Sequence, residues 1–176
     1  EPILDQSAVF GLRCMVLARP HEDILVLTSH GRLVRLYLHQ IPFLAASEDT
    51  ARSWPEQPCI SLEAGEQLCG AIALSELPRF WTAVTRRGVV RQFLQAQLDS
   101  YIAEGKQIMG GDQGSDGPVT LVNGDRGDLL LVTRWGNAVR FPQMAIAGPA
   151  TQGIQVERDD EVVAAVPLPQ ETEVIV

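Results

Sequence analysis

The side chains of this 176-residue chain best suited to binding chemistry are seven arginines gathered in three short segments. The segments 28–42, 85–98 and 133–147 hold seven of the 14 basic residues and none of the 22 acidic ones. These seven are Arg32, Arg35, Arg86, Arg87, Arg91, Arg134 and Arg140. A guanidinium presents a planar fork of N–H donors that matches a pair of phosphate oxygens. Although the formal net charge is −8, this segregation predicts a phosphate-binding rim, with the acidic remainder repelling nucleic acid from the other faces.

The three arginine segments also repeat one pattern of residues. LVLTSHGRLVR (25–35), TAVTRRGVVRQ (82–92) and LLVTRWGNAVR (130–140) each read as an apolar run, Thr, two residues and Gly. The apolar runs are typical of strands buried on both faces. A three-residue turn that ends on glycine at positive φ fits the T-x-x-G sequence. We therefore predict three β-hairpins, anchored at residues 24–42, 80–98 and 129–147.

A second repeated unit lies between the hairpins. Residues 58–74 are similar to residues 152–168, and 25 residues separate Ile60 from Thr85 and Ile108 from Thr133. Self-similarity at about 50 residues predicts a propeller-like array, in which strands from one repeat can complete its neighbour. We expect a single all-β domain over 1–176, with half-units at 3–17 and 152–176, forming an open arc or half ring. We predict a strand and then a loop for residues 92–105.

The repeats as a whole resemble a known family. An apolar strand, T-x-x-G, a basic residue and then a G-I-x-V…E-V-V strand pair are clearest in VTRWGNAVRFPQMAI and TQGIQVERDDEVVAAV. This pattern resembles the C-terminal β-pinwheel domain of type IIA DNA topoisomerase A subunits, those of DNA gyrase and topoisomerase IV. The chain departs from gyrase in having fewer hairpin repeats and no Q-R-R-G-G-K-G-like loop, which favours a topoisomerase IV-like or divergent domain.

The resemblance implies a function as well as a fold. It implies a bacterial cytoplasmic, nucleoid-associated domain that binds and bends duplex DNA through basic hairpin tips, largely without regard to sequence. It also implies two protein partners: an ATPase subunit, and the remainder of a topoisomerase A subunit. The enzyme as a whole would be an ATP-dependent isomerase.

We expect no catalytic residues and no cofactor in the chain itself. His21, His30 and His39 have no partners at catalytic or metal-ligand spacing, and Cys14, Cys59 and Cys69 form no CxxC pair. Of the two tyrosines, Tyr37 is interpreted as a packing residue. Four aspartates lie in glycine-rich loops that do not match a calcium-binding loop, so ordinary turn chemistry is favoured over a metal site: Asp112, Asp116, Asp125 and Asp128. No apolar run is long enough to cross a membrane, so we expect no membrane partner.

The alternative interpretation is a pinwheel scaffold that acts as a protein-interaction or self-assembly module. An open arc has unpaired strands at its ends, and proteins normally cover such edges. Residues 173–176 (EVIV) could pair with the edge near Ile3 of a second chain, so that two arcs close one ring as a homodimer. Trp135, at a turn tip, is expected to pack on its own repeat.

Overall fold

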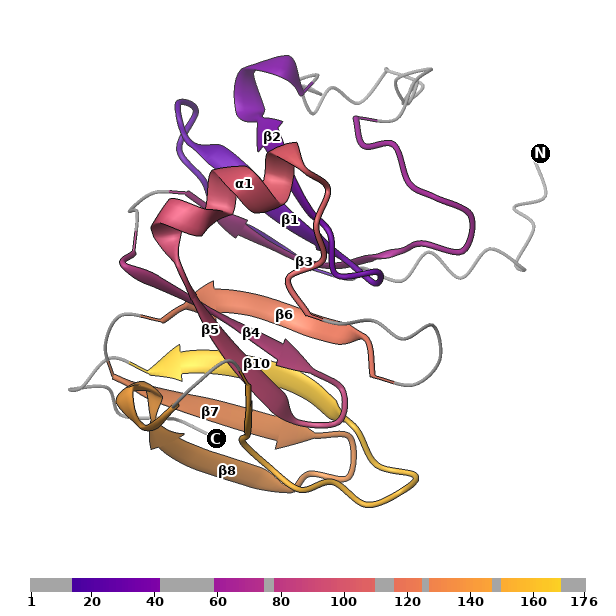
Figure 1. Ribbon diagram of the computed structural model, residues 1–176, viewed down its shortest axis with the longest axis vertical. Helices are drawn as coiled ribbons and strands as arrows, with labels where there is room; N and C mark the ends of the chain where they lie inside the picture. Colours follow the sequence, from indigo (N-terminus) through magenta and orange to yellow (C-terminus); the bar gives the residue numbers. More distant parts are fainter. Residues whose placement is uncertain are drawn as a thin grey trace, which may run out of the picture.

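In the computed structural model, the residues described are 14–41, 59–74, 78–109, 116–124, 127–146 and 150–168. They form three antiparallel sheets, each made of a hairpin and a later third strand, and we call each sheet a blade (Figure 1). The first blade has the order β2-β1-β3, the second β6-β4-β5-β9 and the third β10-β7-β8.

The first-blade strands are β1 (Asp23–Thr28), β2 (Leu33–Tyr37) and β3 (Leu68–Ala73). The second-blade strands are β4 (Phe80–Thr85), β5 (Val89–Leu94), β6 (Pro118–Asn123) and β9 (Thr151–Gln152). The third-blade strands are β7 (Asp128–Thr133), β8 (Ala138–Pro142) and β10 (Val162–Leu168). Short 3-10 turns follow the three hairpins at Leu38–Gln40, Gln95–Gln97 and Gln143–Ala145.

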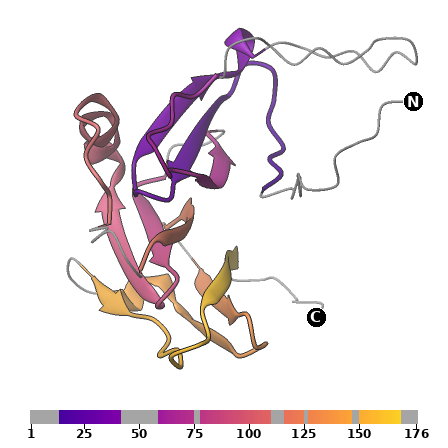
Figure 2. The same ribbon diagram turned by 90° about the vertical axis from the view of Figure 1, so that its right-hand side faces the viewer.

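The blades stack in chain order around their third strands. Strand β6 contacts both β3 and β10, so the third strands are neighbours and the hairpins point outward. The three hairpin turns lie on the same side of the stack, the right-hand side of Figure 1. Figure 2 shows the blades fanning out without closing into a ring. The prediction of an all-β, propeller-like open arc is confirmed.

Two apolar layers between the blades hold the arc together. Leu25, Leu27 and Leu33 of the first blade pack with Trp81, Ala83 and Phe93 of the second. Val84 and Val90 on the other face of the second blade pack with Leu129 and Leu131 of the third. Because a hairpin alone cannot bury both faces, stacking supplies the buried apolar area that stabilises each strand.

Strand β9 shows how neighbouring blades are linked. It lies between β8 and β10 in the sequence, yet it pairs with β5 of the second blade through Val89–Gln152 and Val90–Thr151. The backbone N–H of Gly153 then donates to the carbonyl of Gly88, 2.9 Å away. The expectation that a neighbouring repeat completes a blade is confirmed for this blade.

The prediction of a strand and then a loop over residues 92–105 was wrong in its second part. After β5 and a 3-10 turn, α1 (Leu98–Ala103) forms one short helix. Leu98 is buried, and Tyr101 and Ile102 pack against the layer between the first two blades. These residues are three and four positions apart, which places them on one helical face. No helix among the described residues is long and apolar enough to cross a membrane.

Candidate nucleic-acid interface

The three T-x-x-G turns share one hydrogen-bonded geometry. The N–H of each glycine donates to the carbonyl of the threonine three residues earlier, at 2.9–3.0 Å. The buried hydroxyl of each threonine accepts the N–H of the residue after the glycine, at 3.1–3.2 Å. Gly31, Gly88 and Gly136 have φ between +78° and +83°, which confirms the positive φ expected at these glycines. Two hydrogen bonds therefore hold the backbone of each turn, which fixes the backbone positions of the arginines beside it.

An acidic residue lies behind each turn, two positions before the third strand of its blade. Asp116 accepts the N–H of Arg87 at 2.7 Å, and Asp160 accepts those of Trp135 and Glu161 at 3.2 and 2.8 Å. Glu66 binds Arg32 with both carboxylate oxygens, one of them 2.8 Å from Nε. This role of the three acids was not predicted from the sequence, although their shared spacing from β3, β6 and β10 is a signal for it.

The pKa values of two of these acids lie below their ordinary values. The hydrogen bond from Arg32 lowers the pKa of the Glu66 carboxyl to about 2 against the opposing effect of burial, with further bonds from Glu63 and Thr28. Burial raises the pKa of Asp160, but hydrogen bonds from Thr133, Glu161, Trp135 and Asn137 outweigh it. Both acids are thus held as carboxylates by the turns they support.

One cluster of metal-ligand types lies beside the first turn. Ligand atoms of His30, Glu63 and Glu66 lie within 4.8 Å of one another. The Arg32 guanidinium already occupies both oxygens of Glu66, and His30 Nδ1 lies 3.5 Å from the carboxylate of Glu63. The two carboxylates therefore face the guanidinium of Arg32, which supplies the positive charge that a metal ion would supply in a metal site.

Two of the predicted arginines repeat one ion pair on the outer strands. Arg35 on β2 binds Asp23 at the start of β1 (2.7 Å), and Arg140 on β8 binds Asp128 at the start of β7 (2.5 Å). The Arg35 guanidinium also lies over the ring of Tyr37, 5.6 Å from its centroid. Arg140 is 52% exposed, so part of its guanidinium faces solvent. Exposed pairs of this kind contribute little to stability, and a phosphate can share such an arginine.

Two other predicted arginines are bound by the backbone. Arg87 donates to the carbonyls of Val156, Glu157, Arg158 and Asp160 at 3.0–3.3 Å, which ties the second hairpin to the third blade. Arg91 donates to the carbonyl of Ile108 and, at 3.1 Å, to the hydroxyl of Tyr101. These guanidinium groups hold loops in place, which leaves them few donors for a phosphate.

Replacing Arg87 by glutamine is expected to lower the free energy of unfolding by about 2 kcal/mol, because hydrogen bonds from a charged donor contribute about 1.5–3 kcal/mol. Arg86→Gln is the matched control: it removes the same charge from the same turn, and no side-chain partner of Arg86 is found among the described residues. We expect the control to change stability by less than about 0.5 kcal/mol. Urea unfolding followed by circular dichroism measures both, and equal losses would contradict the role given to Arg87.

Arg86 and Arg134 occupy the same position in their turns, and both line one cleft. The cleft, about 470 Å³, is lined by both arginines, Gln67, Glu161 and the first residues of β3, β6 and β10. Arg134 is 59% exposed and pairs with Glu161. The backbone N–H groups of Arg86 and Arg134 are fixed by the carbonyls of Gly117 and Glu161 at 3.0 and 2.8 Å. Two cationic side chains thus project from rigid turns of neighbouring blades into the same solvent-filled space.

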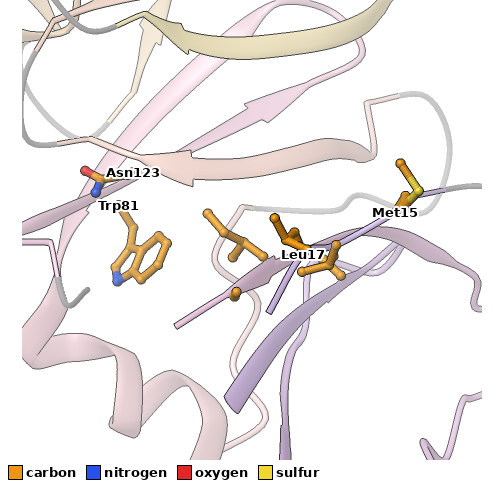
Figure 3. A pocket seen from close by; sticks show the side chains of 8 residues that line it. Met15, Leu17, Trp81 and Asn123 are labelled. Carbon is orange, nitrogen blue, oxygen red and sulfur yellow. The ribbon is translucent and has the colours of Figure 1, made fainter. Parts of the chain in front are cut away.

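A second cleft differs in its chemistry. It holds about 380 Å³ and lies between the segment at residues 15–17 and strands β3, β4 and β6, with Met15, Leu17, Trp81 and Asn123 in its lining (Figure 3). No charged side chain of the described residues lines it. It therefore offers apolar contact and is no candidate for phosphate binding.

The expectation that Trp135 packs on its own blade is wrong, because 55% of this residue is exposed. Its backbone is held by Asp160, and the glycine of its turn has no neighbouring segment among the described residues. The residues invoked for a terminal strand pairing, Ile3 and 173–176, lie outside the described part of the chain, as do Asp112 and Asp125.

The fold defines a class: an open pinwheel of hairpin blades with basic turn tips. No protein-family model matches the chain. It is 28% identical over 162 residues to the DNA gyrase A subunit of Haloquadratum walsbyi, an alignment that covers 84% of this chain and 18% of that protein. It is 27% identical over 150 residues to the DNA gyrase A subunit of Aminobacterium colombiense, again covering 18% of the relative. The chain thus spans less than a fifth of these relatives.

Solved structures agree with the sequence relatives. The C-terminal domain of DNA gyrase A superposes with a TM-score of 0.62 at 15% identity, over 86% of this chain and 50% of that one. The C-terminal domain of DNA topoisomerase IV gives 0.63 at 18% identity, over 85% and 48%. The resemblance to the C-terminal β-pinwheel domain of type IIA topoisomerase A subunits is therefore confirmed, over about half the length of these two solved domains.

Proposed function

We propose that this domain is a DNA-binding accessory domain of a type IIA topoisomerase A subunit. The observation that carries the proposal is the pair of equivalent turn arginines, Arg86 and Arg134, which project into one cleft on a pinwheel scaffold. Both relatives named above are A subunits of DNA gyrase. The domain would act in the cytoplasm beside an ATPase subunit and the rest of the A subunit. DNA cleavage and ATP use would belong to those other parts.

The proposed DNA contacts are the predicted arginines whose guanidinium groups remain accessible. These are Arg35, Arg86, Arg134 and Arg140. Arg32, Arg87 and Arg91 support the contacts indirectly, because their donors bind Glu66, a loop backbone and the segment after α1. Phosphate contacts from fixed arginines carry no base information, so the binding would be largely independent of sequence. Contacts spread over successive blades of a curved array favour a bent duplex.

The variant Arg86→Gln/Arg134→Gln tests the proposal. We expect it to weaken binding to a fluorescent duplex about tenfold. We also expect the slope of log affinity against log salt to become less steep by about one to two. Arg79→Gln is the matched control, because Arg79 precedes β4 at the end of the blade opposite the turns and stacks on Phe80, 5.2 Å from its ring centroid. Unchanged affinity in the double variant, or an equal loss in Arg79→Gln, would contradict the assignment.

A protein-interaction or self-assembly module is the second candidate. It is favoured by apolar side chains that remain exposed on the third blade, namely Trp135, Met144, Val163 and Val166. The two functions differ on one point. A partner module keeps its association when Arg86 and Arg134 are replaced, and a DNA-binding domain loses affinity for the duplex.

A further inference from the structure

The contact between consecutive blades uses the same sequence positions twice. Residues six and four positions before each turn glycine, and two positions after it, form the face that packs on the next blade. In the first blade they are Leu25, Leu27 and Leu33, which are 1–3% exposed. In the second blade they are Thr82, Val84 and Val90, which are all fully buried.

In the third blade the same face has no blade against it among the described residues. Its equivalent residues are Leu130, Val132 and Ala138, of which the first two are half-buried and the third is exposed. None belongs to either buried cluster. Val166, which pairs with Leu130 across β10 and β7, is 43% exposed. The equivalent faces of the first and second blades each cover the next blade within the chain.

The turn of the third hairpin also lacks, among the described residues, the segment that covers the other two turns. The carbonyl of Gly31 accepts the N–H of Ile108 at 2.9 Å, and that of Gly88 accepts the N–H of Gly153 at 2.9 Å. A Cβ on Gly31 or Gly88 would meet Met109 O at 3.0 Å or Ile154 O at 2.3 Å, whereas one on Gly136 meets nothing within 4 Å in the described structure. Strand β8 is correspondingly an edge strand.

The first blade presents the complementary half of this contact. Ile24, Val26 and Leu36 occupy the positions of Trp81, Ala83 and Phe93, which receive the first blade. Ile24 and Leu36 are half-buried, whereas Val26 at the centre of this face is 4% exposed. The segment at Cys59–Leu62 aligns with Gly153–Val156, the segment that covers the second turn. No hairpin precedes the first blade within the described residues, and Leu62 is 40% exposed. Within the described residues, the third-blade face and the segment at residues 59–62 thus lack the partners that their equivalents have in the two contacts inside the chain.

We propose that the third blade of one copy binds the first blade of a second copy of this chain. The sheet face of Leu130, Val132 and Val166 packs on Ile24 and Leu36 of the second copy, and residues 59–62 of that copy lie along β8 with a backbone N–H donated to the Gly136 carbonyl. The charges match, since the segment 133–147 has two arginines and no acid, whereas Glu63 beside residues 59–62 is 64% exposed. The contact joins two different surfaces, so it is heterologous and leads to a ring if the rotation closes.

Trp135 lies at the proposed contact, so its fluorescence can be used to follow the association. It occupies the turn position of Arg87, whose guanidinium lies against the carbonyls of residues 156–160. In the associated state its indole lies over the equivalent carbonyls of residues 62–66 of the second copy. Its fluorescence emission should therefore shift to shorter wavelength as concentration rises, and Trp135→Phe should remove that shift.

Sedimentation velocity of the 176-residue chain over a concentration series tests the association, with no DNA present. We expect reversible self-association that Val166→Glu and Leu62→Glu each weaken roughly 100-fold or more, because each buries an unpaired charge at one half of the contact. Both positions are already 40–43% exposed in the single chain, so the monomer should keep its melting temperature. Leu94→Glu is the matched control, at a 42% exposed leucine on the second blade.

Mixing the two variants separates this contact from a symmetric one. Each variant retains the intact half that the other lacks, so an equimolar mixture should recover a 1:1 dimer that cannot extend further. A wild-type chain that stays monomeric at its highest soluble concentration would overturn the proposal. So would a mixture that stays monomeric while wild type associates. Because no arginine of the proposed DNA interface is altered, the two proposals can fail independently.

Discussion

Gly88→Ala is expected to lower the free energy of unfolding by about 2–5 kcal/mol. A left-handed backbone costs a non-glycine residue about 1–2 kcal/mol, and overpacking adds about 1–3 kcal/mol. Gly88 has φ +81°, and an added Cβ would lie 2.3 Å from the carbonyl oxygen and 2.7 Å from Cγ2 of Ile154. The segment around Ile154 would have to leave the second turn, and with it the pairing of β9 to β5. Urea unfolding at low protein concentration gives the value.

Gly136→Ala is the control that separates backbone strain from packing. Its φ is +83°, nearly that of Gly88, but the added Cβ meets nothing within 4 Å in the described structure. We therefore expect only the backbone cost of about 1–2 kcal/mol. Equal losses for the two alanine variants would contradict the idea that a segment of the next repeat seals the second turn.

Acid is expected to destabilise the first blade through Glu66. Its carboxyl has a pKa of about 2 in the folded chain against an ordinary value of 4.5. A lowered folded pKa stabilises the fold above pH 4.5, and this contribution is lost as pH falls from about 4.5 to about 2. A pKa difference of one between the folded and unfolded chain corresponds to about 1.4 kcal/mol, so the loss amounts to about 3 kcal/mol.

Glu66→Gln tests this assignment directly. The amide cannot pair with the charge of Arg32, so the variant should be about 2–3 kcal/mol less stable at pH 7, and its stability should depend less on pH below 4.5. Glu63→Gln is the control, because Glu63 is 64% exposed and lies 4.0 Å from Arg32 Nε. A pH profile of Glu66→Gln that keeps the wild-type slope would assign the acid transition to other carboxylates.

The hairpins could be predicted because their signals are local. Thr28, Gly31 and their equivalents lie within one turn, and the alternation of strands and turns follows from the same few residues. The acids behind the turns could not be assigned in the same way. Glu66 is 34 residues from Arg32, and only the pairing of β3 with β1 brings them together.

The role of each arginine depends on tertiary contacts that composition does not contain. Arg86 and Arg87 are adjacent, yet Arg87 is bound to carbonyls about 70 residues away and Arg86 opens into the cleft. A sequence pattern gives both the same phosphate-binding role. Trp135 was misjudged because its turn position faces away from its own blade: the equivalent Arg87 contacts residues 156–160 of the next repeat, and Trp135 is 55% exposed. Helix α1 was missed because three apolar side chains in one turn give a weak periodic signal.

The salt dependence of duplex binding tests the central claim most directly. Titration of the chain against a fluorescent duplex across a series of salt concentrations gives the slope of log affinity against log salt. Four accessible arginines on phosphates predict a slope of about −3 to −4, since each neutralised phosphate contributes about −0.9. An absence of binding at low salt would contradict the DNA-binding role, because the acidic body would then outweigh the arginines of the turns.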